Sequence, residues 1–253
     1  TFVDPSVPPA APTLISTLGG IITEVAVEAE RTAYIVEMND TIDFTAKITD
    51  IADNSNVSGA GVDFIWDFGK TNQTLGVVAS NSEGNATYSF TPSGIAPGYY
   101  DVGIVVQDDL TDPLVAGNSQ RYGNSTTINV TVQVTSAIAI DSIPSTVTAG
   151  VPFNVVGQVD DAENLSRGLI SAVRLNVFWL ENPEELLLTN YATGTNGSFN
   201  MTVPTDTANN GTTRGPHTLV ISVVNGSSPF YLTASAQAPI QVMGVSLLEN
   251  LQP

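Results

Sequence analysis

TINVTVQV, residues 127–134, alternates polar and apolar side chains without interruption. Successive side chains of an extended strand point to opposite faces, so the alternation gives each face its own character. The apolar face carries Ile128, Val130, Val132 and Val134. The other face is polar, and the stretch therefore predicts a half-buried β-strand with one face in a core.

The same alternation recurs along most of the chain. In TIDFTAKI, residues 41–48, the inward set is Ile42, Phe44, Ala46 and Ile48. Short turn signals separate such segments, and no convincing helical period appears. The one helix candidate, LENPEELLLTNY at residues 180–191, is interrupted by Pro183, so we expect a turn with a single helical turn there. The predicted fold class is all-β.

The strand pattern occurs twice. Residues 36–54 resemble residues 145–164, since each has a turn, an alternating strand and an acidic loop. An aromatic strand follows each, at 62–68 and at 175–181. Two units of this size fit two tandem Ig-like antiparallel β-sandwiches.

Part of the first unit resembles a PKD domain. The resemblance rests on four motifs: Trp66-Asp67-Phe68-Gly69, Tyr88-Ser89-Phe90, Pro97-Gly98-Tyr99-Tyr100-Asp101-Val102 and Val105-Val106-Gln107-Asp108. The sequence departs from the PKD pattern after Gly69, where Lys70-Thr71 replaces the usual Asp-Gly turn and the following loop is longer.

The second unit is similar to Ig-like surface repeats of bacteria and archaea. Its markers are TAGVPF at 148–153, NGSF at 196–199 and GPHTL at 215–219. Together the two resemblances imply β-sandwiches on an exported, often archaeal, cell-surface protein, and they imply no catalytic residue.

We therefore expect four parts. Residues 1–20 form a Pro-rich extended arm or linker, 21–136 a PKD-like sandwich, 137–243 an Ig-like sandwich and 244–253 a C-terminal tail. The boundary has no Gly/Ser spacer, so we expect the sandwiches to stack end to end with little freedom.

Basic residues are unusually few. The formal net charge is −18, with two lysines and five arginines against 25 acidic residues. Nucleic acids and anionic bilayers need clustered Lys and Arg, so neither is an expected partner. The absence of cysteine excludes disulfides and thiolate zinc sites. No apolar run is long enough to span a membrane. A start at Thr1 without methionine is what a processed or excised product would have.

Eleven Asn-x-Ser/Thr triplets are about three times the number that random placement would give. They begin at Asn39, Asn56, Asn72, Asn85, Asn124, Asn129, Asn164, Asn196, Asn200, Asn210 and Asn225. Strand parity or turn position leaves these side chains outside the core. Heavy N-glycosylation is the expected reading, and a solvent face rich in Asn, Ser and Thr is the alternative. Two triplets share NGSFNMT, residues 196–202, where we expect a hairpin turn at Asn196-Gly197 and Asn200 facing solvent.

Acidic loop residues suggest calcium as a possible ligand, because carboxylates on loops suit its flexible geometry. The candidates are Asp108, Asp109, Asp112, Asp160, Asp161 and Glu163. None of them has the spacing of a known calcium loop, and solvated loop acids are the alternative.

Signals for catalysis are weak. His217 is the only histidine, and we expect it at a turn or strand edge. Trp66 and Trp179 each lie in an apolar strand, where an Ig-type core tryptophan belongs. We expect no enzyme.

The expected function is a non-enzymatic, N-glycosylated structural subunit of an extracellular assembly (S-layer, sheath or filament) that associates with itself or with other surface-layer subunits. Domain edges and terminal segments would make the contacts, including strand addition by apolar residues near 13–28, although 21–29 also fits as the first strand of its own domain. The alternatives are an adhesin or carbohydrate-binding module, and an accessory region of a secreted hydrolase.

Overall fold

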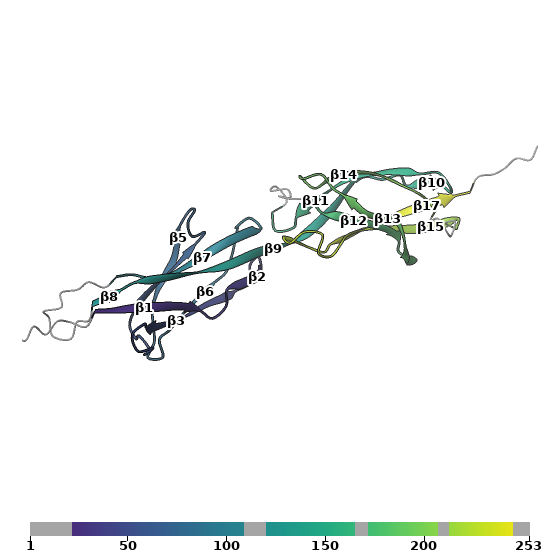
Figure 1. Ribbon diagram of the computed structural model, residues 1–253. Helices are drawn as coiled ribbons and strands as arrows, with labels where there is room; N and C mark the ends of the chain where they lie inside the picture. The colour runs from purple at the N-terminus through teal and green to yellow at the C-terminus, as the bar shows by residue number, and fades with distance from the viewer. Residues whose placement is uncertain (1–21, 109–119, 165–171, 207–212, 245–253) are drawn as a thin grey trace, which may run out of the picture.

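The computed structural model describes residues 22–108, 120–164, 172–206 and 213–244 (Figure 1). All elements within these ranges are strands, as the alternating patterns predict. The N-terminal half contains β1 (Ile22–Ala29), β2 (Ala33–Glu37), β3 (Ile42–Asp50), β4 (Gly61–Trp66), β5 (Gln73–Ala79), β6 (Asn85–Phe90), β7 (Gly98–Val106) and β8 (Gln120–Tyr122). The long strand β9 (Asn124–Ser142) follows. The C-terminal half contains β10 (Thr146–Thr148), β11 (Phe153–Asp161), β12 (Arg174–Trp179), β13 (Asn182–Ala192), β14 (Ser198–Val203), β15 (Gly215–Val223), β16 (Tyr231–Leu232) and β17 (Ser235–Met243).

The strands form two tandem Ig-like sandwiches. In the N-terminal sandwich, the sheet β6-β3-β1-β8 faces a sheet made of β2, the first part of β9, β7, β4 and β5. In the C-terminal sandwich, β14, β11, the second part of β9 and β16 face the sheet β10-β17-β15-β12-β13. Most pairs are antiparallel, and this confirms the predicted fold class.

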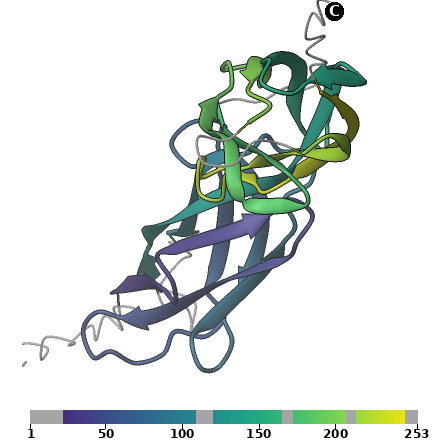
Figure 2. The same ribbon diagram turned by 90° about the vertical axis from the view of Figure 1, so that its right-hand side faces the viewer.

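Strand β9 belongs to both sandwiches. Its residues 124–132 pair with β7, and its residues 136–142 pair with β11. The backbone therefore crosses from one sandwich to the other as a strand rather than as a loop. Figures 1 and 2 show the two sandwiches arranged end to end along this strand.

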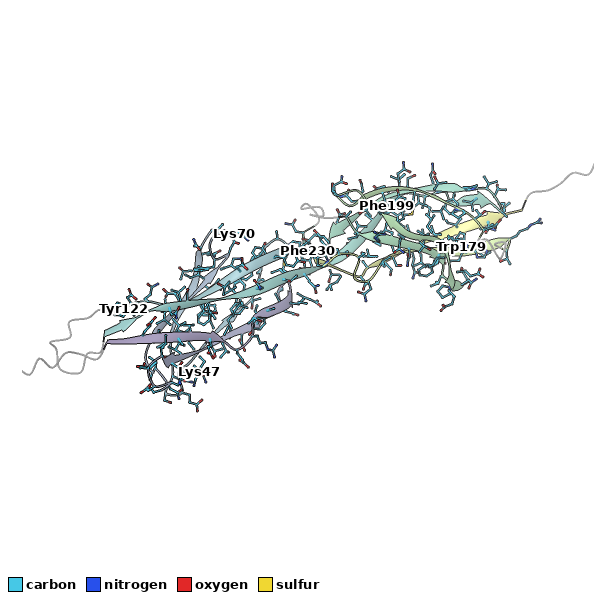
Figure 3. The ribbon with its side chains drawn as sticks, viewed as in Figure 1. Lys47, Lys70, Tyr122, Trp179, Phe199 and Phe230 are labelled. Atoms are coloured by element: carbon cyan, nitrogen blue, oxygen red, sulfur yellow. The ribbon has the colours of Figure 1, made fainter. Side chains whose placement is uncertain are left out.

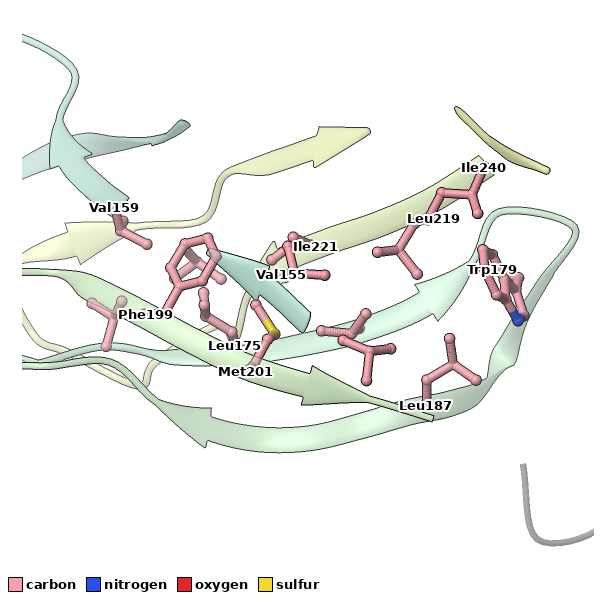
Figure 4. Packing of buried hydrophobic residues seen from close by; sticks show 14 of the residues in the cluster. Val155, Val159, Leu175, Trp179, Leu187, Phe199, Met201, Leu219, Ile221 and Ile240 are labelled. Atoms are coloured by element: carbon pink, nitrogen blue, oxygen red, sulfur yellow. The ribbon is translucent and has the colours of Figure 1, made fainter. Parts of the chain in front are cut away.

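Each sandwich has its own core. In the N-terminal core, Phe44, Phe64 and Ile128 are fully buried, and the Trp66 ring lies 4.7 Å from the ring of Tyr100. The C-terminal core packs Leu175, Met201 and Leu219 between its sheets, with Trp179 toward one end (Figure 4). Both tryptophans are buried, as expected.

One local prediction is wrong. The segment expected to hold a helical turn forms strand β13, which joins β12 through a tight turn at Leu180–Glu181. Strand β13 is the outermost strand of its sheet. Proline is tolerated on an edge strand, because the amide hydrogen that Pro183 lacks is not needed for pairing with a further strand. Edge position therefore outweighs the helix signal of the Glu- and Leu-rich sequence.

Candidate glycan-acceptor sites and the interdomain junction

Ten of the eleven predicted acceptor asparagines lie within the described residues. Nine of these are exposed: Asn39, Asn56, Asn72, Asn124, Asn129, Asn164, Asn196, Asn200 and Asn225. Asn85 is half-buried at the start of β6. Asn210 lies outside the described residues, as do the second and third positions of the Asn164 triplet. A glycan must leave the protein surface, and the exposed positions meet that requirement.

Some acceptor asparagines have a backbone role of their own. Asn39 and Asn72 adopt left-handed φ values of 69° and 51°, which asparagine tolerates better than most residues. The side chain of Asn72 also accepts a 2.7 Å hydrogen bond from the Gly69 amide. Asn196 Oδ1 accepts a 2.8 Å bond from the Ser198 hydroxyl. At these turns, the local conformation or a side-chain hydrogen bond accounts for asparagine without a glycan.

Two acceptor asparagines in the interior of strands have no such backbone reason. Asn129 lies in β9 and Asn200 in β14, and both side chains are exposed. Asparagine is uncommon in strands, and neither position is a turn. The preference of asparagine for turns therefore does not explain either position. The third residue of each triplet, Thr131 or Thr202, lies on the same face two positions further on. Both acceptor amides are thus presented on open sheet surfaces.

The NGSFNMT stretch is only partly as predicted. Phe199, Met201 and Val203 are buried while Asn200 faces solvent, which confirms the predicted parity. However, β14 pairs with β11 and not with β13, the strand that precedes it in the chain. The turn at Asn196-Gly197 is therefore not a hairpin, because it carries the chain from one sheet of the sandwich to the other.

The described acidic candidates accept hydrogen bonds from within the protein, and Glu163 accepts one from the Asn39 side chain. Asp108 Oδ1 accepts a 2.6 Å bond from the Gly123 amide, and the fully buried Asp161 accepts bonds from the Glu163 and Asn164 amides. Asp160 accepts a bond from the Gln158 side chain. Within the described ranges, no group of three or more His, Cys, Asp or Glu residues could hold a metal ion. Asp109 and Asp112 lie outside these ranges, and calcium binding stays a prediction.

The junction between the sandwiches has specific contacts. The Tyr99 ring lies 4.8 Å from the Phe230 ring at an interplanar angle of 70°, and Gln133 Nε2 donates a 2.8 Å bond to the Pro229 carbonyl. Phe230 lies midway along the molecule in Figure 3. Met38, at the end of the N-terminal sandwich, is buried in the C-terminal core cluster. Side-chain contacts thus hold the junction together, in addition to the unbroken strand β9.

Sequence reasoning missed these junction residues. Tyr99 belongs to one of the PKD-like motifs, and Phe230 belongs to none of the motifs. The two are far apart in sequence, and no local pattern signals that they meet.

The tryptophan-containing motif of the PKD resemblance forms a turn. Asp67 and Gly69 have φ values of 51° and 82°, Thr71 donates a 3.0 Å bond to Asp67, and the Lys70 ammonium lies 3.3 Å from it. Desolvation pushes the pKa of Asp67 upward, but Thr71 and Lys70 outweigh it and hold that pKa below its ordinary value. Asp67 and Gly69 thus shape the turn that follows β4.

His217 lies in β15 and packs on Trp179, with ring centroids 5.3 Å apart. Its Nε2 is 2.7 Å from the Thr213 carbonyl oxygen, and its Nδ1 is 3.6 Å from a Glu181 oxygen. Tyr100 occupies the matching place beside Trp66 in the N-terminal sandwich. The matching positions indicate that His217 helps to cover the core tryptophan.

Comparisons with known proteins add no family. No protein-family model matches the chain, and no curated protein matches it either. Among solved structures, the chain is similar to an ICAM-5 D1–D4 ectodomain fragment, at 13% identity and TM-score 0.48, over 87% of this chain and 54% of that one. It is also similar to the tandem repeats in the extending region of a large adhesion protein, at 15% identity and TM-score 0.40, over 87% and 49%.

A third similarity is to the fibronectin(III)-like modules of Clostridium thermocellum CbhA, at 13% identity and TM-score 0.33, over 90% of this chain and 99% of that one. The chain thus spans about half the length of the first two structures. Similarities at these values say nothing about what the chain binds or does. No helix among the described residues is long and apolar enough to cross a bilayer.

Proposed function

We propose that this chain is a non-enzymatic, N-glycosylated structural subunit of an extracellular cell-surface assembly. The observation that carries the proposal is the placement of the acceptor asparagines. Nine of the ten described ones are exposed, and two of these lie on open strand faces where asparagine has no backbone role. A glycan at these positions meets no steric obstacle from the core.

The rod-like form supports a structural role. Two sandwiches arranged end to end and joined by one continuous strand form an elongated unit, which suits a subunit of an S-layer, sheath or filament. A surface short of lysine and rich in Asn, Ser and Thr, with a net charge of −18, would stay hydrated and would repel anionic surfaces. The PKD-like character of the first sandwich and an archaeal source belong to the same proposal.

Glycopeptide mass spectrometry of the native protein tests the glycosylation. We expect sugar on Asn129 and Asn200 at least, and unmodified asparagine at all eleven positions would overturn that part. Electron microscopy of native surface material tests the assembly: ordered sheets or fibres labelled by an antibody to this chain are expected. Soluble monomers in the medium would contradict it.

A binding module is the second candidate function. One observation favours it. The Tyr99 side chain is 64% exposed and the Ile35 side chain is 71% exposed. Both residues are in register with Thr131 of β9, so their side chains lie on the same outer face of the sheet. Exposed aromatic and aliphatic side chains can stack on sugar rings. Glycan-array binding that is lost in Tyr99→Ala would support this candidate over the first.

A further inference from the structure

The two sandwiches are topological copies of one another. Strands β8, β1, β3 and β6 of the first correspond in order to β16, the second part of β9, β11 and β14 of the second. The other sheets correspond in the same way, because β2, β9, β7, β4 and β5 match β10, β17, β15, β12 and β13. Each sandwich therefore has the same two ends. At the junction, the end of the N-terminal sandwich where β9 leaves it meets the end of the C-terminal sandwich where β9 enters it.

The backbone at the outer end of the described N-terminal sandwich matches the backbone at the junction face of the C-terminal sandwich. At the junction, the Ala162 amide donates a 2.9 Å bond to the Thr135 carbonyl. At the free end, the Ile51 amide donates an equivalent 2.9 Å bond to the Glu24 carbonyl. Tyr122 is the registered partner of Glu24 in β8. We call this free end, with Ile51 and Tyr122, the N-terminal pole.

The backbone at the outer end of the described C-terminal sandwich matches the backbone at the other junction face. At the junction, the Met38 amide donates a 2.8 Å bond to the Gln133 carbonyl. At the free end, the Ala149 amide donates a 2.8 Å bond to the Met243 carbonyl. The residues that follow, Asn39 and Gly150, have matching φ values of 69° and 76°. We call this free end, with Val151 and Met243, the C-terminal pole.

Both poles expose apolar side chains. Ile51 is 48% exposed and Tyr122 49%, while Val151 is 51% exposed and Met243 50%. These four are half of the exposed large hydrophobic side chains among the described residues. At the C-terminal pole, Met243 stands where the junction has Gln133, whereas Ala149 and Pro216 stand where it has Met38 and Tyr99.

We propose that copies of this chain join end to end, with the C-terminal pole of one copy seated on the N-terminal pole of the next, as the two sandwiches of one chain already meet. The proposal rests on the proposed function and names its partner, a second copy of the chain. Contacts between two different faces are heterologous, so they extend into open chains rather than closing into dimers. Figure 3 shows Tyr122 and Trp179 toward opposite ends of the molecule, as such a chain requires.

The intermolecular contact is expected to be weaker than the junction, because it lacks the continuous strand. Two copies also carry a net charge of −18 each and repel one another. Salt screens that repulsion, with a Debye length of about 3 Å at 1 M ionic strength. Association should therefore grow with both protein concentration and salt.

Sedimentation velocity of the full chain, made without glycosylation, tests the proposal. We expect species longer than dimers at high concentration and high salt. Met243→Glu blocks one pole and Tyr122→Glu blocks the other, so each variant alone should be monomeric. Mixing the two should restore heterodimers and nothing longer, since each variant keeps one open pole. Val77→Glu is the matched control: Val77 is 64% exposed but lies on the edge strand β5, and this variant should associate like the native chain.

Three results would overturn the proposal. The native chain could remain monomeric under all conditions, Val77→Glu could abolish association, or the two folded pole variants could fail to complement each other. Circular dichroism of each variant shows whether it is folded, and Tyr122→Ser and Met243→Ser replace any variant that is not. These results are distinct from those that would contradict the proposed function. Unmodified asparagines and soluble native protein would contradict the proposed function.

Discussion

Asn39 Nδ2 donates a 3.1 Å hydrogen bond to Glu163 Oε2, joining two residues that are 124 positions apart and on opposite sides of the interdomain junction. Asn39 belongs to the turn after β2, and Glu163 follows β11. The same asparagine is a predicted glycan acceptor. An N-linked sugar replaces one of its two amide hydrogens and leaves the other for Glu163.

Asn39→Asp should weaken the junction. It replaces a hydrogen bond by two carboxylates at close range, with an expected loss of roughly 1 kcal/mol in the free energy of unfolding. Thermal unfolding at low salt and at 1 M salt measures it, and salt should recover part of the loss. Asn39→Gly is the control, since glycine accepts the left-handed φ and brings no charge. Equal, salt-independent effects of both variants would contradict the electrostatic account.

Leu175→Ala should destabilise the C-terminal sandwich by about 2–5 kcal/mol, because it opens a cavity at a fully buried site. Each sandwich has one tryptophan, so fluorescence of Trp179 in a Trp66→Phe background follows this sandwich. Leu180→Ala, at a 47% exposed position, should change stability by less than about 0.5 kcal/mol. A similar effect of both changes would contradict the described core.

Gly103→Ala should destabilise the N-terminal sandwich, because a Cβ there would overlap the Phe68 ring that lies against the glycine. We expect a loss of about 1–3 kcal/mol in denaturant unfolding. The double variant with Phe68→Ala should lose less than the two single losses combined, since removing the ring removes the clash. Additive losses in the double-mutant cycle would show that the two residues do not touch.

The pKa of Asp67 predicts a pH effect on stability. This pKa is lower in the folded than in the unfolded state, so ionised Asp67 stabilises the fold above its unfolded pKa of about 4. The contribution is lost as pH falls through the folded pKa. Asp67→Asn should therefore reduce the drop in melting temperature between pH 7 and pH 3. Thr189→Ala, on an exposed strand position away from Asp67, should leave the drop unchanged.

Strand parity was readable from the sequence because it depends only on neighbouring residues. The alternation of 127–134 and 41–48 correctly places Ile128 and Phe44 in the cores. Which strands pair with one another is harder to predict from the sequence. The Pro183 segment is a strand because it lies at a sheet edge, and Asn196-Gly197 changes sheets because β14 pairs with β11. Both facts depend on residues distant in sequence.

The candidate sites divide in the same way. Exposure of the acceptor asparagines follows from parity and turns, so the sequence was enough to predict it. The contacts of Asn39 with Glu163 and of Tyr99 with Phe230 join opposite sides of the boundary, and no local pattern could anticipate them. The correspondence of the two poles with the junction faces also emerges only from the sheet order.

The pairing of β2 and β9 has a mechanical consequence. The two strands are parallel, with five residues in register from Ala33 to Glu37. A pull on the two ends of the rod draws them in opposite directions along their length, so their slanted hydrogen bonds are loaded in shear and must break together. The parallel pair β10 and β17 places the C-terminal sandwich under the same geometry. We therefore expect the chain under tension to hold its length and then yield abruptly, because the bonds of each parallel pair share the load.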